Sequence, residues 1–127
     1  MLLQNRVALV TGAGRGIGRA LCREFLRRGA LGVAIADLDG ELARRTAAEL
    51  GVIGLECDVS DARAVAQAVS GVEERYGRLD LLVSNAGFGS TALDLDDALG
   101  EPDATWQRMW EVHVMAHVHA CRAALPG

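Results

Sequence analysis

A glycine-rich segment at residues 11–18, TGAGRGIG, directly follows the short apolar run at residues 7–10. The residues after it have the periodicity of an amphipathic helix, with Gly29 as a stop signal. A buried strand therefore leads into a glycine turn, and the turn opens a helix. Glycines let the backbone approach an anion closely, and a helix N-terminus offers unpaired N–H groups at the positive end of its dipole. The segment predicts a phosphate-binding turn near the start of the chain.

Strands and helices alternate along the rest of the chain. Apolar runs predict strands at residues 7–10, 32–37, 52–57 and 79–84. Helical periodicity predicts helices at residues 17–28, 41–50 and about 105–125, with a further helix that Ser60 caps and whose apolar stripe ends at Tyr76. A polar, acidic connection is expected at residues 88–105.

This alternation is typical of βαβ units that form a parallel sheet. Because the strands are apolar throughout, we expect helices on both faces of the sheet. Right-handed crossovers then give the strand order 3-2-1-4, which is an α/β, doubly wound, Rossmann-type sheet in a partial form with four strands. Its crevice opens where the winding reverses, beyond the C-terminal ends of the first and fourth strands.

Composition narrows the class of protein. Half of the 127 residues are hydrophobic, which is enough for one domain with a buried core. The net charge of -4 disfavours nucleic acid as a partner, because phosphate binding requires a basic surface. No apolar run approaches the ~20 residues of a membrane span and no signal-peptide pattern is present, so we expect a cytoplasmic protein. The widely spaced Cys22, Cys57 and Cys121 predict reduced, buried thiols and no metal site.

The spacing of the glycines indicates which kind of turn this is. Gly12, Gly16 and Gly18 fit the pattern G-x-x-x-G-x-G and do not fit G-x-G-x-x-G. An acidic residue, Asp37, follows Gly18 by 19 residues and ends the second predicted strand. A glycine turn alone is also compatible with an α/β protein that binds no nucleotide. Strand, turn, helix and acid together predict a dinucleotide site.

Asp37 bears on the choice of dinucleotide. Its carboxylate can accept hydrogen bonds from the hydroxyl groups of an adenosine ribose, and it opposes a 2′-phosphate. Two unit charges ~4 Å apart repel by ~1 kcal/mol in water and ~4 kcal/mol at an effective dielectric constant of 20. NAD is therefore predicted over NADP. Arg15 acts in the opposite direction, since a guanidinium in the glycine turn can meet a 2′-phosphate. The alternative for Asp37 is a turn or helix-capping residue.

Polar and small residues also follow the third and fourth predicted strands. Asp58 can accept a hydrogen bond from an adenine amino group while Val59 packs on the ring, or Asp58 is only a turn residue before Ser60. The fourth strand leads into three small residues, Asn85, Ala86 and Gly87. Their size lets a ribose and a nicotinamide lie against the backbone, and the side-chain amide of Asn85 can bridge neighbouring loops by hydrogen bonds. A plain strand-to-loop turn is the alternative.

In order and spacing, these residues resemble the short-chain dehydrogenase/reductase family. Trp106 and the triplet Val112-His113-Val114 are similar to the family's next helix, so the resemblance spans essentially the whole chain. It implies an NAD(P)-dependent oxidoreductase that transfers hydride between a nicotinamide and an alcohol or carbonyl substrate. The motifs and the resemblance together predict cofactor contacts at Gly12, Arg15, Gly16, Ile17, Gly18, Asp37, Asp58, Val59, Asn85, Ala86 and Gly87.

Two departures from the family pattern limit what carries over. His113 stands where the family has the asparagine of its catalytic tetrad; it can bind a water or relay a proton, but it lacks the paired donor and acceptor of an amide. The family's serine and Tyr-x-x-x-Lys lie beyond this helix. The chain contains no lysine, and its single tyrosine, Tyr76, is predicted to be core. We therefore expect residues 1–127 to be the N-terminal, cofactor-binding part, inactive alone.

Two other interpretations stay open. The chain is alternatively a non-catalytic NAD-binding module that self-associates through its last helix, or a fragment of a longer reading frame. His113 and His117 have the i, i+4 spacing of metal ligands, but no third ligand accompanies them. Together with Trp106, Met109 and Trp110 they predict a packing or subunit-contact face.

Overall fold

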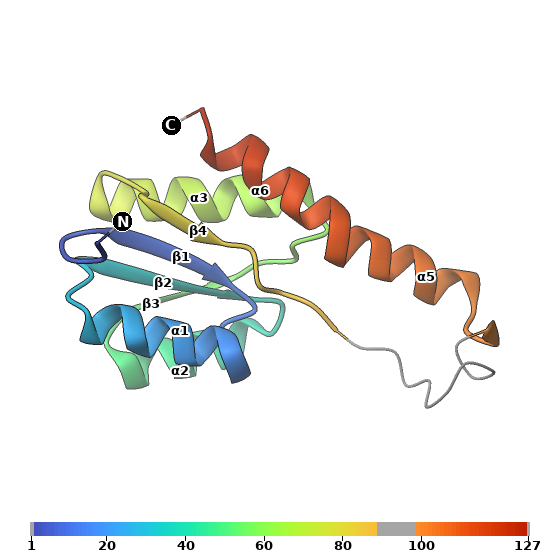
Figure 1. Cartoon of the computed structure of the whole chain (residues 1–127), viewed down its shortest axis with the longest axis horizontal. Helices are drawn as coiled ribbons and strands as arrows, with labels where there is room; N and C mark the ends of the chain where they lie inside the picture. The colour runs from blue at the N-terminus through green and yellow to red at the C-terminus, as the bar shows by residue number, and fades with distance from the viewer. Residues whose placement is uncertain (1, 89–98, 127) are drawn as a thin grey trace.

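The structure is a computed structural model and describes residues 2–88 and 99–126 (Figure 1). Along the chain its elements are β1 (Val7–Thr11), α1 (Gly16–Arg27), β2 (Gly32–Asp37), α2 (Gly40–Leu50), β3 (Ile53–Glu56), α3 (Ala62–Tyr76), β4 (Leu81–Val83), α5 (Asp103–Trp110), a π-helical turn η1 (Glu111–Met115) and α6 (Ala116–Ala124). Most of the predicted acidic connection, at residues 89–98, lies outside the described residues.

The strands form one parallel sheet in the order β3-β2-β1-β4, which confirms the predicted topology. β1 lies in the middle, with Leu9 opposite Ala34 of β2 and Leu82 of β4. β4 is the edge strand on its side among the described residues. The winding reverses between β1 and β4, so a crevice forms beyond the C-terminal ends of these two strands.

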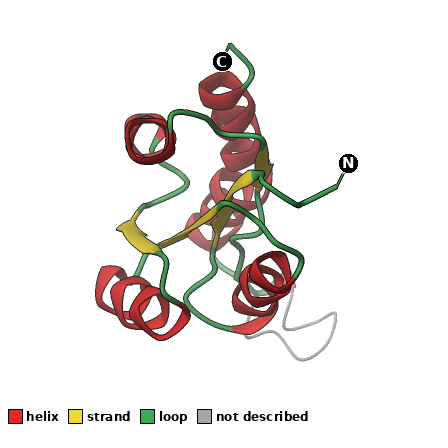
Figure 2. Ribbon diagram, turned by 90° about the vertical axis from the view of Figure 1, so that its left-hand side faces the viewer, coloured by secondary structure: helices red, strands yellow, loops and turns green. Residues whose placement is uncertain are grey.

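Helices cover both faces of the sheet, as the apolar strands predict. α1 and α2 lie on one face and α3 and α6 on the other (Figures 1 and 2). Successive β1 side chains alternate between the two cores: Val7 and Leu9 join the core under α3 and α6, whereas Ala8 and Val10 join the core over α1 and α2. All four are at most 1 % exposed. Burying a side chain of valine or leucine size stabilises the fold by roughly 1.5–3 kcal/mol.

Asp61 caps α3. Its Oδ1 accepts a hydrogen bond from the backbone N–H of Arg63 at 2.9 Å. The prediction that Ser60 is this cap is wrong, because the Ser60 hydroxyl donates to Oδ1 of Asp58 at 2.6 Å instead. Serine and aspartate both cap helices well, but Asp61 is the last extended residue before α3 begins and therefore takes the cap position.

The predicted last helix is a run of α5, η1 and α6. The π-helical turn inserts an extra residue into the helical repeat, which changes the face that each later side chain presents. Val112 and Ala116 are buried in the core beneath α3. Trp106 and Trp110 are each 54 % exposed, so the predicted packing face makes no tight core with the described residues. A contact between subunits on this face stays a prediction. None of the described helices combines the length and the apolar run that crossing a membrane requires.

Glycine at position 54 is a test of how closely α2 packs on β3. A Cβ at Gly54 would lie 2.6 Å from the carbonyl oxygen of Ala43, which is backbone and cannot rotate away. We expect Gly54→Ala to lower the free energy of unfolding by about 1–3 kcal/mol in urea titrations. The matched control is Gly71→Ala in the interior of α3, where a Cβ meets nothing within 4 Å. This control should gain about 0.5–1 kcal/mol, and equal effects of both substitutions would contradict the packing described.

Candidate functional site

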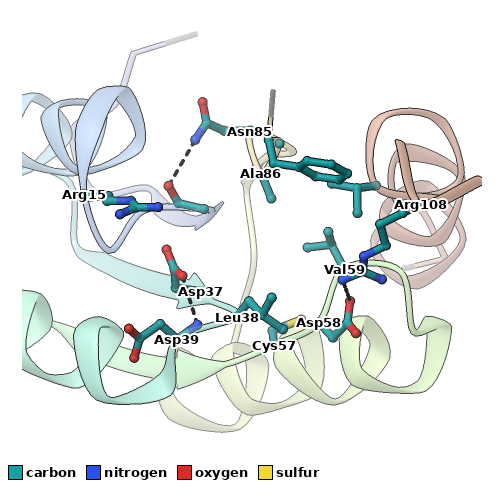
Figure 3. Close-up of a pocket in the computed structure, with 14 residues that line it drawn as sticks. Arg15, Asp37, Leu38, Asp39, Cys57, Asp58, Val59, Asn85, Ala86 and Arg108 are labelled. Carbon is teal, nitrogen blue, oxygen red and sulfur yellow. Dashed lines mark hydrogen bonds and ion pairs between the residues drawn. The ribbon is translucent and has the colours of Figure 1, made fainter. Parts of the chain in front are cut away.

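A cleft of about 610 Å³ opens at the C-terminal ends of the strands (Figure 3). All four strand ends contribute to it, together with α5 and η1. Among the predicted contact residues, it is lined by Gly12, Arg15, Asp37, Asp58, Val59, Asn85, Ala86 and Gly87. It is also lined by residues that the sequence did not assign to a site: Leu38, Asp39, Cys57, Phe88, Arg108 and Val112.

Gly16, Ile17 and Gly18 lie at the start of α1 and do not line the cleft wall. Gly16 has a φ of +63°, a conformation that favours glycine, whereas the side chain of Ile17 is 76 % exposed. Gly18 is buried, and a Cβ there would lie 2.6 Å from the carbonyl oxygen of Gly12 and 2.7 Å from Nδ2 of Asn85. Gly18 therefore lets the first turn of α1 approach both strand ends.

Gly12 also allows a close backbone contact, in this case between the turn after β1 and the turn after β4. Its φ is +65°, and a Cβ would lie 2.6 Å from Cα of Ala86. The turn after β1 and the turn after β4 therefore touch through backbone at a position where any side chain would separate them. Both Gly12 and Ala86 line the cleft.

Thr11 and Asn85 tie these two turns together. Oγ1 of the buried Thr11 accepts hydrogen bonds from the backbone N–H groups of Asn85 at 3.0 Å and Ala86 at 3.2 Å. The side-chain amide of Asn85 donates back to the carbonyl oxygens of Thr11 at 3.1 Å and Gly12 at 3.3 Å. The predicted bridging by Asn85 is present. Thr11 was missed as a site residue, although its place directly before the glycines was a visible signal.

Both oxygens of Asp37 accept hydrogen bonds from the protein. Oδ2 accepts from the backbone N–H of Gly14 at 3.0 Å, and Oδ1 accepts from that of Asp39 at 3.1 Å. The turn interpretation of Asp37 is thus correct as a description of its contacts, while its carboxylate also lines the cleft. A second tie comes from Thr46, a buried residue whose hydroxyl donates to the carbonyl oxygen of Gly14 at 2.6 Å. The glycine turn is therefore held from β2 and from α2.

Asp58 also accepts hydrogen bonds from the protein. Its Oδ1 accepts from the backbone N–H of Ser60 at 3.0 Å, from the Ser60 hydroxyl at 2.6 Å and from Nη2 of Arg108 at 3.5 Å. Burial raises the pKa of Asp58, but the hydrogen bonds from Ser60 and the charge of Arg108 outweigh it, so this pKa lies below its ordinary value. The carboxylate therefore stays ionised at neutral pH.

The helix that follows the glycine turn differs from its neighbours in how its N-terminus is satisfied. Asp39 and Asp61 cap α2 and α3 with side-chain hydrogen bonds. The N-cap of α1 is Arg15, which makes no such bond, and the first turn of α1 contains no acidic residue. This N-terminus therefore keeps its N–H groups and its positive dipole end available to an anion.

His113 holds the turn after β4. Its Nε2 lies 2.8 Å from the carbonyl oxygen of Phe88, and its ring fills the space that a Cβ at Gly87 would need, 2.7 Å from Cε1. Nδ1 of His117 pairs separately with the hydroxyl of Ser84 at 2.6 Å. No group of three metal-ligating side chains gathers in the part of the chain that the structure describes.

The arrangement defines a class of protein: a doubly wound α/β domain whose glycine turn, helix N-terminus and strand-end acids line one cleft. The family model described as short chain dehydrogenase matches residues 6–127. The chain belongs to this family.

Relatives and solved structures extend the comparison. Sorbitol dehydrogenase of Cereibacter sphaeroides is 37% identical over 116 residues, which cover 90% of this chain and 43% of that protein. Cis-1,2-dihydrobenzene-1,2-diol dehydrogenase of Pseudomonas putida is 37% identical over 132 residues, 99% of this chain and 46% of that protein. The chain spans about half the length of the curated relatives it matches.

Two similar structures contain a nicotinamide dinucleotide. One is the 3-ketoacyl-(acyl-carrier-protein) reductase from Brucella melitensis complexed with NADH, with a TM-score of 0.88, 33% identity and coverage of 98% of this chain and 50% of that one. The other is a short-chain dehydrogenase/reductase from Burkholderia phymatum in complex with NAD, with a TM-score of 0.90, 30% identity and coverage of 99% and 45%.

Gly18→Ala tests the close contact at the start of α1. Alanine ordinarily stabilises a helix relative to glycine by about 1 kcal/mol. Here the added methyl group meets backbone of the β1 turn, so we expect the free energy of unfolding to fall by about 1–3 kcal/mol. Urea unfolding followed by circular dichroism measures this difference. Stability equal to the unsubstituted chain would show that the turn does not depend on the absence of a side chain.

The reactivity of the three cysteine thiols tests which of them are buried. Burial raises the pKa of Cys22 to about 12, and burial with the charges of Asp58 and Asp61 raises that of Cys57 to about 11. The prediction of a buried thiol is wrong for Cys121, which is exposed. With a disulfide reagent at pH 8 we expect one fast-reacting thiol per chain, and none in Cys121→Ser, until urea unfolds the protein. Two or three fast thiols would contradict this burial.

Proposed function

We propose that residues 1–127 bind NAD(H) and form the cofactor-binding part of a short-chain dehydrogenase/reductase. The observation that carries the proposal is the backbone contact between the β1 and β4 turns, next to the uncapped N-terminus of α1. A diphosphate lies favourably at such an N-terminus, because its N–H groups and dipole complement the negative charge. The two similar structures that contain NADH and NAD support the choice of ligand.

The proposal assigns each part of a dinucleotide to residues at the strand ends and at the start of α1. The glycine turn, with Gly12, Arg15, Gly16, Ile17 and Gly18, would hold the diphosphate. Asp37 would accept from the adenosine ribose, and Asp58 with Val59 would contact the adenine. The nicotinamide end would lie against the turn that Thr11 supports, formed by Asn85, Ala86 and Gly87. The close backbone contacts support this assignment, because a Cβ at Gly12 or Gly18 would lie 2.6 Å from Cα of Ala86 or from the carbonyl oxygen of Gly12 and would push these turns apart.

NAD is proposed over NADP because of the charge on Asp37. Its two oxygens are oriented by Gly14 and Asp39, so the carboxylate cannot readily turn away from the cleft that it lines. A 2′-phosphate near this group would be repelled by about 1 kcal/mol or more. Arg15 is exposed and lines the same cleft, where its positive charge would attract a 2′-phosphate. The proposal gives Asp37 more weight, because hydrogen bonds fix its position whereas the long side chain of Arg15 can move.

When bound, NAD supplies the hydride acceptor for oxidation of an alcohol, or NADH the donor for reduction of a carbonyl. This chain's own residues would bind and orient that group. The family's catalytic serine and Tyr-x-x-x-Lys have no counterparts in this sequence, which contains no lysine. Its single tyrosine, Tyr76, packs against Gly32 and does not line the cleft. Proton transfer to or from a substrate is thus proposed to need residues outside this sequence.

The alternative is a non-catalytic NAD-binding module that self-associates. The exposed tryptophans favour it, since Trp106 and Trp110 present large apolar surfaces on consecutive turns of α5, and Leu125 beyond α6 is 79 % exposed. Sedimentation of the chain at several concentrations distinguishes the two proposals. A stable dimer that binds NAD without turnover favours the module, whereas a monomer favours the cofactor-binding part of a longer enzyme.

Calorimetric titration of the 127-residue chain with NAD and NADP tests the proposed ligand. We expect NAD to bind at least about fivefold more tightly than NADP, because the Asp37 charge opposes the extra phosphate by ~1 kcal/mol. Asp37→Asn removes this charge and keeps an acceptor oxygen, so the ratio should fall towards one. Glu41→Gln, which removes an exposed charge from the first turn of α2 outside the cleft, serves as the matched control. No detectable binding of either dinucleotide would refute the proposal.

A further inference from the structure

Arg108 reaches from α5 to the loop after β3, across 48 to 50 residues of sequence. Its Nη1 donates to Oγ of Ser60 at 2.6 Å, and its Nη2 donates to Oδ1 of Asp58 at 3.5 Å. Arg108 and Asp58 both line the cleft, and they lie together at one end of it (Figure 3). The fork of the guanidinium therefore engages two side chains of the same loop.

Ser60 stands between the two charged groups. Its hydroxyl accepts from Arg108, which has only donors, and donates its single proton to Oδ1 of Asp58 at 2.6 Å. Arg108 thus fixes the direction of the serine hydroxyl. The backbone N–H of Ser60 reaches the same carboxylate oxygen at 3.0 Å.

These contacts treat the two oxygens of Asp58 differently. Three donors converge on Oδ1: the Ser60 amide, the Ser60 hydroxyl and Arg108. Within residues 2–88 and 99–126, no group donates a hydrogen bond to Oδ2. An ionised carboxylate can only accept hydrogen bonds, so Oδ2 is left as an acceptor for a donor that enters the cleft.

We propose that Arg108 is a positioning residue which, through Ser60, holds Asp58 with Oδ2 open to the exocyclic amino group of a purine and so selects adenine over a 6-oxo purine. This inference rests on the proposed binding of NAD(H). Adenine presents a donor at this position, whereas hypoxanthine presents a carbonyl oxygen that the carboxylate would repel. Val59, which follows Asp58 and is 7% exposed, lies beside this end of the cleft.

The pair is too exposed to act mainly as a structural ion pair. The side chains of Arg108 and Asp58 are 37% and 39% exposed, and exposed ion pairs contribute little to stability. One N–H of each Nη group of Arg108 donates to the loop, which orients the guanidinium towards Ser60 and Asp58. Its effect should therefore appear as selectivity between purines.

The experiment compares NAD with nicotinamide hypoxanthine dinucleotide, in which oxygen replaces the amino group, by calorimetric titration of the full chain. We expect the unsubstituted chain to bind NAD about tenfold more tightly, which is typical of one hydrogen bond to a charged group. Arg108→Gln should lower this ratio at least about threefold, mainly through weaker NAD binding. Arg108→Lys, which keeps a charge without the fork, should give an intermediate ratio.

Ser60→Ala is the second variant, and it tests the same link without altering α5. It removes the hydroxyl that joins Arg108 to Asp58, so the ratio should fall as it does in Arg108→Gln. Arg28→Gln is the matched control, since Arg28 pairs with Glu24 on α1 outside the cleft and its loss should leave the ratio unchanged. Circular dichroism of each variant shows whether it is folded.

The outcomes separate this inference from the proposed function. If NAD binds and both Arg108→Gln and Ser60→Ala leave the ratio unchanged, the positioning role is wrong and NAD binding stands. If Arg108→Gln weakens both dinucleotides by the same factor, Arg108 contacts a phosphate or supports the fold, and the positioning role is also wrong. If the unsubstituted chain binds neither dinucleotide, the proposed function and this inference both fail.

Discussion

The contact between the turns after β1 and β4 is the constraint on which the rest of the cleft depends. Gly12 meets the backbone of Ala86, and Gly18 brings the first turn of α1 against the same place. Thr11 and Asn85 then lock the contact with four hydrogen bonds between the two strand ends. The order of winding puts these turns side by side, but only residues without a Cβ allow the backbones to meet. The fold therefore produces the crevice, and the glycines allow the two turns beside it to meet through backbone.

Periodicity and turn chemistry predicted most of the fold, because they act over short stretches of sequence. β2 has the predicted bounds, Gly32–Asp37, and the strand order follows from right-handed crossovers alone. Local rules failed where two neighbours suit one role, as Ser60 and Asp61 do at the start of α3. They also gave no sign of the π-helical turn η1, because one extra residue in a helical repeat depends on packing against the rest of the chain.

The residues of the candidate site likewise include some that the sequence could identify and others that it could not. Asp37 and Asn85 could be found because they stand at strand ends that the fold brings together. Arg108 could not be found, since its contact with Asp58 crosses 50 residues and nothing in its own helix marks it. Phe88 and Leu38 are intermediate cases: they adjoin predicted site residues, but apolar side chains carry no chemical signal of their own.

The electrostatics of the cleft follow from how each group is satisfied before any ligand enters. Asp37 receives two backbone N–H groups and Asp58 receives three donors, so their charges are held in place, and each still has lone pairs to offer. The N-terminus of α1, which follows β1, is left without a cap, and both carboxylates lie on one side of it, after β2 and β3. A positive site with two acceptors on one side of it complements a molecule whose anionic part is joined, on that side, to groups that donate hydrogen bonds. That division of charge is a stronger argument for a dinucleotide than the glycines alone, because a bare anion offers no hydrogen-bond donor to either carboxylate.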